Sequence, residues 1–335
     1  MKDAKTAVVL GGYGLIGSAC AAALQRRGFV VTGVGRSRRA AIRSNTGIEW
    51  VILEFAEATT ADWREVFAGA DVIVNASGAL QEGVHDKLAR IHTDAIAAMI
   101  PAAEKAGARF IQISAAGASE SAATSFFRTK ALGDHLLTQS VLDWCILRPV
   151  LVISPQAYGG TALLRASAAM PMVGLLISPE APVQTVSVTD VATAVADAAE
   201  GKIKSGTIAD LTEERPQTLQ ELTTSLRAWQ GYPPWRWTIR MPSVLARSAG
   251  FVADAFGWLG WRSPMRTNAL RVLENGVYGD AEAWRGTGGQ DCRPLLVKPW
   301  QRCHPLPRSA GLPACFWCRR SPLPALRSSG WLRAF

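Results

Sequence analysis

The first 211 residues alternate short apolar runs with longer segments in which apolar positions recur at helical spacing. The runs predict seven strands: Ala7–Leu10, Val30–Val34, Glu49–Leu53, Val72–Asn75, Phe110–Ser114, Cys145–Leu147 and Thr207–Leu211. The segments between them predict five helices: Ile16–Arg27, Asp62–Phe67, Asp86–Ala106, Ser125–Gln139 and Val188–Glu200. Apolar strands that alternate with helices are typical of a parallel sheet covered on both faces. We therefore expect an α/β fold with a doubly wound, mostly parallel sheet over residues 1–212.

The pattern changes after residue 211. Thr218, followed three residues later by Glu221, predicts a capping box that begins a helix, and residues 242–275 predict one or two amphipathic helices. We expect a small C-terminal helical lobe over residues 213–285. The apolar stretch Ala166–Ser178 is too short for a membrane span and contains Pro171, so it predicts a buried loop or helix.

The positive charge of the chain is concentrated at its end. The formal net charge is +9, and residues 292–335 carry eight basic residues and no acidic one, which leaves 9 − 8 = +1 for the first 291 residues. A nearly neutral body does not indicate a nucleic-acid partner.

Residues 286–335 form an irregular tail in which neither a helical nor a strand period is sustained. It holds four of the six cysteines: Cys292, Cys303, Cys315 and Cys318. With His304 they offer zinc ligands, but no second Cys-x-x-Cys pair matches the first, so no metal site is expected. A tail without function is one alternative. A frameshift near residue 286 explains more of its composition, and resequencing the gene there would decide.

The other two cysteines, Cys20 and Cys145, lie in apolar runs and are expected to be reduced core residues. The N-terminus leads almost directly into the first strand, which leaves no room for a signal peptide. We expect a cytoplasmic protein.

A glycine-rich turn follows the first predicted strand and opens the first predicted helix. It consists of Gly11, Gly12, Tyr13, Gly14, Leu15, Ile16 and Gly17. Gly11 and Gly12 allow a tight turn, Gly14 lets the backbone approach a pyrophosphate, and Gly17 lets helix and strand pack closely. Backbone N–H groups at the helix start then bind phosphate. The turn predicts a dinucleotide site on a Rossmann-type sheet.

The residues after the second strand select the cofactor. NAD enzymes usually place an acidic residue there for the ribose 2′-hydroxyl, whereas this chain has Gly35, Arg36, Ser37, Arg38 and Arg39. Guanidinium groups suit a 2′-phosphate. Arg36 is the first candidate, with Ser37 or Arg38 second, and NADP(H) is favoured over NAD(H). The alternative is a solvated arginine loop.

Two further strand ends complete the expected crevice, because ligands of such sheets lie at the carboxyl ends of the strands. Glu54 and Phe55 are expected to border the adenine. Small residues follow the fourth strand and are expected beside the adenosine half: Asn75, Ala76, Ser77 and Gly78.

An ordered set of motifs now resembles the extended, atypical short-chain dehydrogenase/reductase superfamily. Within it, the chain is similar to the branch of the nucleotide-binding accessory subunit of respiratory complex I and its bacterial relatives. The resemblance covers roughly residues 5–285. It rests on GGYGLIG at 11–17, VNASG at 74–78, QISAAGA at 112–118, the 126–130 segment with Asp134, ILRP at 146–149, VSVTDVA at 186–192 and WRSPMRT at 261–267.

The resemblance implies a catalytic serine and a Tyr-x-x-x-Lys pair, in which the tyrosine acts as acid and base. Ser114 and Lys130 match, and Lys130 would also hold the nicotinamide ribose, but Phe126 occupies the tyrosine position. A phenyl ring transfers no proton, and general acid–base help is worth about 10² to 10⁴ in rate. Stand-in donors are His92, Ser125 and His135.

These features favour an NADP(H)-binding protein without the usual tyrosine-dependent catalysis, with a structural, sensing or assembly role. The alternative is an active reductase, epimerase or isomerase that uses a nonstandard proton donor. The resemblance further implies a respiratory-complex or membrane-associated partner. Arg148 with Pro149 is expected to fix the chain after the sixth strand, and Asp190 to cap a helix or sit in its first turn.

Overall fold

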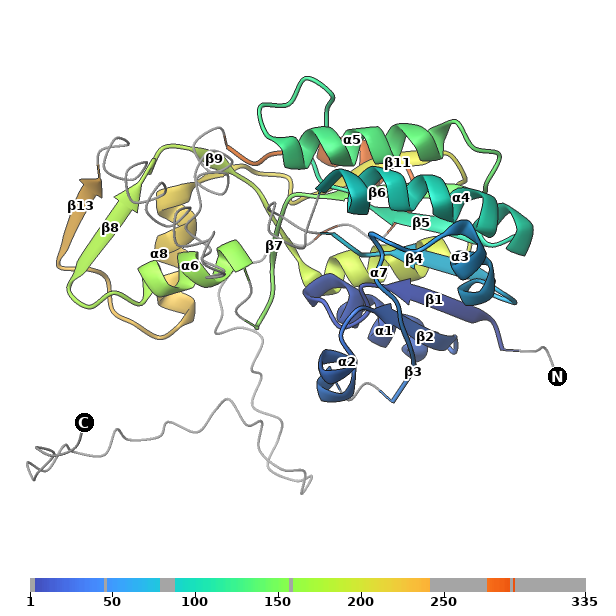
Figure 1. Ribbon diagram of the computed structural model, residues 1–335. Coiled ribbons are helices and arrows are strands. Elements are labelled where there is room, and N and C mark those ends of the chain that lie inside the picture. Colours follow the sequence, from blue (N-terminus) through green and yellow to red (C-terminus); the bar gives the residue numbers. More distant parts are fainter. Residues whose placement is uncertain are drawn as a thin grey trace, which may run out of the picture. The chain divides into compact units, whose positions relative to one another are not determined.

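The computed structural model describes residues 4–44, 47–78, 88–156, 159–241, 276–289 and 292 of the 335-residue chain. Its centre is a seven-stranded sheet (Figure 1). The strands are β1 (Thr6–Leu10), β2 (Val30–Gly35), β3 (Glu49–Ile52), β4 (Val72–Asn75), β5 (Arg109–Ile113), β6 (Trp144–Pro149) and β11 (Thr207–Leu211). Their order is β3-β2-β1-β4-β5-β6-β11, with every neighbouring pair parallel. The seven predicted strands and the doubly wound fold are confirmed.

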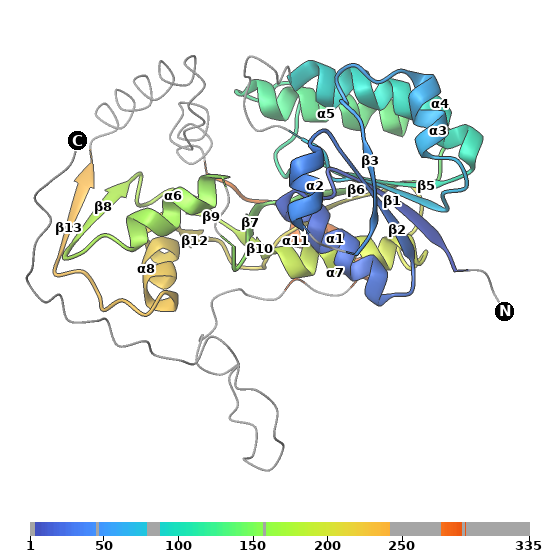
Figure 2. The same cartoon turned by 60° about the horizontal axis from the view of Figure 1, so that its bottom comes forward.

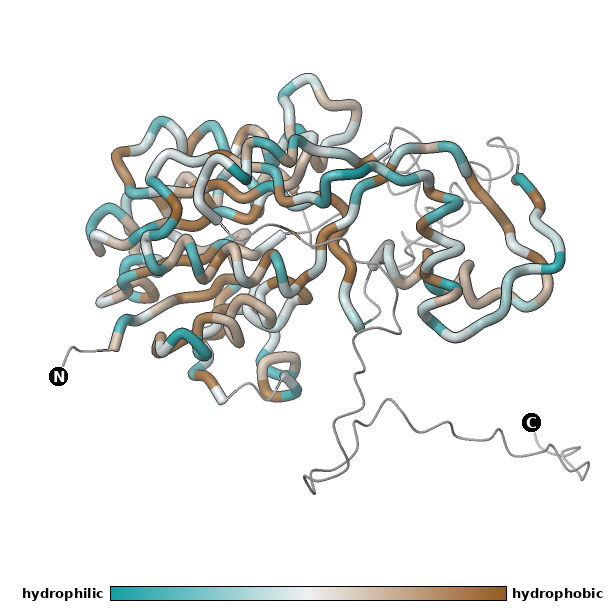
Figure 3. Tube along the Cα trace, turned by 180° about the vertical axis from the view of Figure 1, so that it is seen from behind, coloured by the Kyte–Doolittle hydropathy of each residue, from teal (hydrophilic) through white to brown (hydrophobic). Residues whose placement is uncertain are grey.

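Helices cover both faces of this sheet. One face carries α1 (Leu15–Arg26) and α7 (Val188–Ala199), and the other carries α3 (Thr60–Val66), α4 (Ala95–Ala106) and α5 (Ser125–Thr138), as Figure 2 shows. The sheet residues alternate accordingly: Ala7 and Val9 belong to the core beneath α1 and α7, while Val8 and Leu10 belong to the opposite core. Hydrophobic runs follow the central strands (Figure 3). The strands are therefore apolar on both sides because both sides are covered.

One predicted helix differs in detail, one helix was not predicted, and the start of a third agrees with expectation. The predicted helix Asp86–Ala106 is described from Leu88, with a π-helical turn η1 (Arg90–Asp94) before α4. A short helix, α2 (Arg38–Ser44), begins within the arginine cluster after β2. In α7, Ser187 is the N-cap and Asp190 lies in the first turn, which is the second of the two roles expected for Asp190; it is not the cap.

A smaller lobe contains strands as well as helices. Its helices are α6 (Gly159–Ala168) and α8 (Leu219–Trp229), and its strands are β8 (Val173–Ile177), β9 (Pro182–Val183), β12 (Gln217–Thr218) and β13 (Trp237–Met241). β8 pairs with β13 in parallel, and β9 pairs with β12 antiparallel. The predicted capping box of Thr218 and Glu221 at the start of α8 is confirmed. The predicted helices over 242–275 lie outside the described residues.

The prediction of a buried loop or helix over Ala166–Ser178 is wrong for its second half. α6 ends at Ala168, before Pro171, and Val173–Ile177 forms β8. The partner of β8 is β13, more than 50 residues further along the chain. A local apolar pattern cannot show that pairing.

Residues 276–289 return to the large sheet. Val277 forms a bridge with Val183, next to β10 (Thr185–Ser187), which pairs in parallel with β7 (Leu151–Ile153). Helix α11 (Ala281–Arg285) packs against β11, and Trp284 is buried in the core beneath α1 and α7. The boundaries proposed at residues 212 and 285 remain predictions. No helix in the described part of the chain is long and apolar enough to cross a membrane.

Candidate functional site

The glycine turn lies where the order of the strands reverses, between β1 and β4. Gly11 has a φ of +69°, and its N–H donates to Val34 O at 2.9 Å. A Cβ on Gly11 would lie 2.9 Å from Ala76 O, and a Cβ on Gly17 would lie 2.2 Å from Gly11 O. The backbone is therefore packed too closely for side chains at these positions, as the dinucleotide motif requires.

The N-terminus of α1 has no competing cap. Its N-cap residue, Gly14, provides no side-chain hydrogen bond, and the first turn has no acidic residue. A Cβ on Gly14 would meet only Gly11 O, at 3.1 Å, among its neighbours. Unsatisfied N–H groups and the positive end of the helix dipole favour an anion here. The residues present fit a pyrophosphate.

Tyr13 ties this turn to the end of β2. Its hydroxyl accepts hydrogen bonds from the backbone N–H groups of Arg36 and Ser37, at 3.1 and 3.2 Å. Its ring lies 5.9 Å from the Trp50 ring, and a Cβ on Gly35 would clash with it at 2.2 Å. Tyr13 therefore holds the segment that carries the cofactor-selecting residues.

The three residues expected to select the cofactor lie together after β2. Arg36 is exposed, the hydroxyl of Ser37 accepts from Ala40 N at 3.3 Å, and Arg38 is the first residue of α2. This places guanidinium groups at the carboxyl edge of β2, where a ribose 2′-phosphate would be read.

The residues that follow β3 and β4 are partly enclosed by the protein. The Phe55 ring packs edge-on against Trp63 in the core, 5.4 Å between centroids, and its role beside an adenine stays a prediction. Glu54 is half-buried, and its carbonyl accepts from the amides of Glu57 and Ala58.

Asn75 is buried and donates to Gln112 Oε1 at 2.9 Å. It also accepts from Ser77 N at 3.1 Å, while Gly78 is exposed and Ala76 is half-buried. Asn75 and Ser77 therefore shape the end of β4. The backbone of Ala76, which lies between them, is close to the glycine turn.

Lys130 is buried between the ends of β4 and β5. Its Nζ donates to Ile113 O at 2.9 Å and to Ser77 O at 3.4 Å. Burial lowers the pKa of Lys130 to about 8, although the nearby Asp134 acts in the opposite direction. The ammonium group is thus directed at backbone carbonyls, and its contact with a nicotinamide ribose stays a prediction.

Ser114 belongs to a separate buried network. Its hydroxyl donates to Asp134 Oδ2 at 2.7 Å, and Arg148 forms an ion pair with the same oxygen at 3.0 Å. Burial raises the pKa of Asp134, against the effects of Ser114 and Arg148. The Ser114 hydroxyl is therefore already directed at a carboxylate, and Arg148 fixes β6 to α5 as expected.

The position of the missing tyrosine is apolar. The Phe126 ring meets the His92 ring edge-on at 5.7 Å and the Phe127 ring at 5.2 Å. His92 Nδ1 lies 2.9 Å from Thr129 Oγ1, and burial, with the charge of Lys130, lowers the pKa of His92 to about 2. His92 is therefore neutral near pH 7 and is no cationic acid.

The other two stand-in donors differ in position. Ser125 Oγ accepts from Arg128 Nη2 at 3.2 Å, on the first turn of α5. His135 is exposed on the same helix, whereas Lys130 and Asp134 are buried on its inner side.

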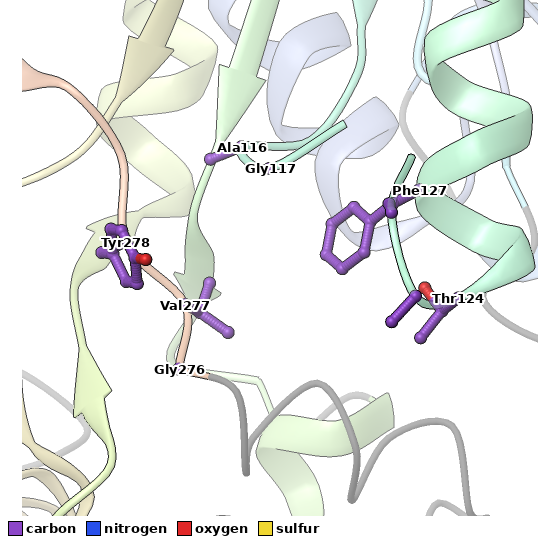
Figure 4. A pocket seen from close by; sticks show the side chains of 9 residues that line it. Ala116, Gly117, Thr124, Phe127, Gly276, Val277 and Tyr278 are labelled. Carbon is purple, nitrogen blue, oxygen red and sulfur yellow. The ribbon is translucent and has the colours of Figure 1, made fainter. Parts of the chain in front are cut away.

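A pocket of about 240 Å³ opens beside the start of α5 (Figure 4). Its described lining residues are Ala116, Gly117, Ala122, Ala123, Thr124, Phe127, Gly276, Val277 and Tyr278. None of these was predicted as a site residue. Tyr278 and Phe127 are about 150 positions apart in the sequence, so no local motif could have joined them.

Comparison with known proteins identifies one matching family and several solved structures of the same fold. The model of a family described as NAD(P)H-binding matches residues 11–202. No curated protein matches the chain. Among solved structures, the NADPH-dependent quinone oxidoreductase QOR2 of Escherichia coli, complexed with NADPH, is 15% identical with a TM-score of 0.64, over 87% of this chain and 97% of that chain.

Two further structures share the fold. The Bordetella bronchiseptica enzyme WbmH, in complex with NAD+, is 18% identical with a TM-score of 0.60, over 80% of this chain and 97% of that chain. The UDP-glucose 4-epimerase of Thermotoga maritima, with UDP-glucose, is 18% identical with a TM-score of 0.58, over 84% and 99%. These neighbours include complexes with NAD+ and with NADPH, so they do not choose between the cofactors.

Proposed function

Because the chain belongs to the NAD(P)H-binding family, whose model spans more than half of its length, we propose that it binds NADP(H) without the tyrosine-dependent catalysis of short-chain dehydrogenases. The observation that carries the proposal is the glycine turn before an uncapped α1, with Arg36 beside it and Phe126 at the tyrosine position.

Each part of the cofactor has candidate partners in this chain. The first-turn amides of α1, at Leu15, Ile16 and Gly17, would hold the pyrophosphate. Arg36, assisted by Arg38, would pair with the 2′-phosphate. When it is bound in an oxidoreductase, NADPH supplies a hydride to the substrate. Here the protein would bind and orient the cofactor, and Lys130 would stand on the nicotinamide side.

The residues near Lys130 favour binding of the cofactor over catalysis. Phe126 has no exchangeable proton, the Ser114 hydroxyl donates to Asp134, and His92 is neutral at physiological pH. A structural, sensing or assembly role follows. The motif resemblance to the complex I accessory branch favours assembly with a larger, respiratory or membrane-associated complex.

One observation favours an active reductase, epimerase or isomerase as the second candidate. The phenol of Tyr278 lies on the wall of the pocket beside α5 and would be a nonstandard proton donor. QOR2, an oxidoreductase with bound NADPH, and the UDP-glucose 4-epimerase show that proteins of this fold include both a reductase and an epimerase.

The Phe126→Tyr variant tests the proposal. With NADPH and a panel of aldehydes, ketones and quinones, the wild-type protein should show no oxidation of NADPH above background. Phe126→Tyr should gain a rate at least about 10-fold above background, since the missing group is a proton donor. Phe126→Leu, which changes the ring without adding a hydroxyl, should gain nothing. Wild-type turnover that Tyr278→Phe abolishes would contradict the proposal and support the second candidate.

A further inference from the structure

The pocket beside α5 is built from three separate segments. Ala116 and Gly117 follow β5, residues 122–124 and Phe127 begin α5, and residues 276–278 come from the returning segment. Figure 4 shows Phe127 and Thr124 on one side of the pocket and Tyr278 and Val277 on the other. It opens at the carboxyl side of the sheet, which is the side of the glycine turn.

The third segment is held in place by backbone hydrogen bonds. Val277 N donates to Pro182 O at 3.0 Å, and Gln184 N donates to Val277 O at 2.7 Å. Gly279 N donates to Gln184 Oε1 at 2.8 Å. The wall that carries Tyr278 is therefore anchored on both sides of that residue, and the pocket is preformed.

The described lining carries no carboxylate, ammonium or guanidinium group. It consists of small residues, two aromatic side chains and the hydroxyls of Thr124 and Tyr278. A nucleoside diphosphate would leave its charges without a cationic partner on these walls. A neutral ligand with a flat apolar surface fits them, because aromatic rings pack well against one another.

Thr124 supplies the one polar group on these walls that is buried and unsatisfied. It is 5% exposed, and its Oγ1 has no hydrogen-bond partner among the described residues. It is the N-cap residue of α5, yet its side chain makes no capping hydrogen bond. Threonine at this position usually caps its own helix. This oxygen has almost no accessible surface in the observed rotamer. A rotation about the Cα–Cβ bond would turn the hydroxyl toward the pocket, where a ligand with an acceptor atom would satisfy it.

We propose that this pocket binds a neutral, planar aryl carbonyl compound of one or two rings. Its rings lie between Phe127 and Tyr278, and its carbonyl oxygen accepts a hydrogen bond from the Thr124 hydroxyl. The inference rests on the proposed function for the ligand's role beside the bound cofactor, but the binding of the ligand is tested separately.

An isosteric pair of probes tests it. 2-Acetylnaphthalene and 2-isopropenylnaphthalene have the same shape and differ in a carbonyl oxygen against a methylene. Equilibrium dialysis of the full chain should show the ketone bound about 5-fold more tightly, the effect of one hydrogen bond. The Thr124→Val variant should bind both probes equally. Thr193→Val, on α7 and outside the pocket, should keep the difference.

A second variant examines the aromatic wall. Tyr278→Leu should weaken the binding of both probes. Tyr232→Leu, at an exposed position away from the pocket, should weaken the binding of neither. Equal affinity of the two probes for the wild-type protein would overturn the proposal, as would tighter binding of UDP-glucose than of the ketone. NADPH is titrated on the same preparations. Loss of NADPH binding with the probe difference retained would contradict the proposed function and leave the pocket assignment standing.

Discussion

At the scale of single residues, burial controls the charge of the polar groups behind α5. Lys130 is 5% exposed, and burial lowers its pKa to about 8. Asp134 is 2% exposed, its pKa is raised by burial, and its Oδ1 has no partner among the described residues. Such groups are costly to bury when charged. The ionisation of Lys130 therefore makes stability depend on pH in the alkaline range.

The sign of this dependence follows from the two lysine pKa values. The pKa of a solvent-exposed lysine is 10.5, and that of Lys130 in the folded protein is about 8, so between these pH values the unfolded chain binds more protons. The titration of Lys130 should therefore raise the free energy of unfolding as the pH rises across this window, by up to about 3 kcal/mol. Urea unfolding at pH 7 and pH 10 should show this gain for the wild type relative to Lys130→Met.

The exposed Lys202 provides the control, because its pKa is raised, first by its hydrogen bond to Glu200. Relative to Lys202→Met, the wild type should show no such gain at high pH. The same pH dependence in wild type and Lys130→Met would show that Lys130 does not titrate in this window.

At the scale of elements, the turn between β1 and α1 depends on the absence of side chains. Gly17→Ala would place a Cβ 2.2 Å from Gly11 O. We expect the turn to shift, with a loss of about 1–3 kcal/mol in the free energy of unfolding and at least about 10-fold weaker NADPH binding. Gly286→Ala is the matched control, because its Cβ would meet nothing closer than 3.9 Å. Urea unfolding and a fluorescence titration of NADPH measure both effects, and equal behaviour of the two variants would contradict this account.

The elements that could be predicted from the sequence are those with a local signal. Strands buried on both faces, such as Val72–Asn75, are apolar runs, and the capping box of Thr218 lies within four residues. β8 was missed because its partner is distant along the chain. The expected place of Phe55 beside an adenine stays a prediction, and its packing against Trp63 could not be predicted because it depends on tertiary contacts that no motif records.

At the scale of the whole molecule, the chain forms α6, β8 and β9 of the smaller lobe before β11 and β12, α8 and β13 after it, and it returns to the large sheet through residues 276–289. The return carries one wall of the pocket beside α5, and Trp284 joins the main core at 2% exposure. The late segment is therefore part of the same folded core as the glycine turn.

Trp284→Ala tests this arrangement. Removing a fully buried indole should lower the free energy of unfolding by about 3–5 kcal/mol, because the lost contacts leave a cavity. Trp237→Ala, at a position 55% exposed on β13, should cost much less. If urea unfolding shows the same small loss for both variants, residues 276–289 do not contribute to the core.

The central claim is that the glycine turn and Arg36 form an NADP(H) site, and a paired titration of NADPH and NADH tests it most directly. At fixed ionic strength, the wild-type protein should bind NADPH at least about 10-fold more tightly than NADH, the effect of one charge-assisted contact. Arg36→Gln should remove this preference and leave NADH binding nearly unchanged. A wild-type preference for NADH would contradict the role of Arg36, and failure to bind either dinucleotide would contradict the claim itself.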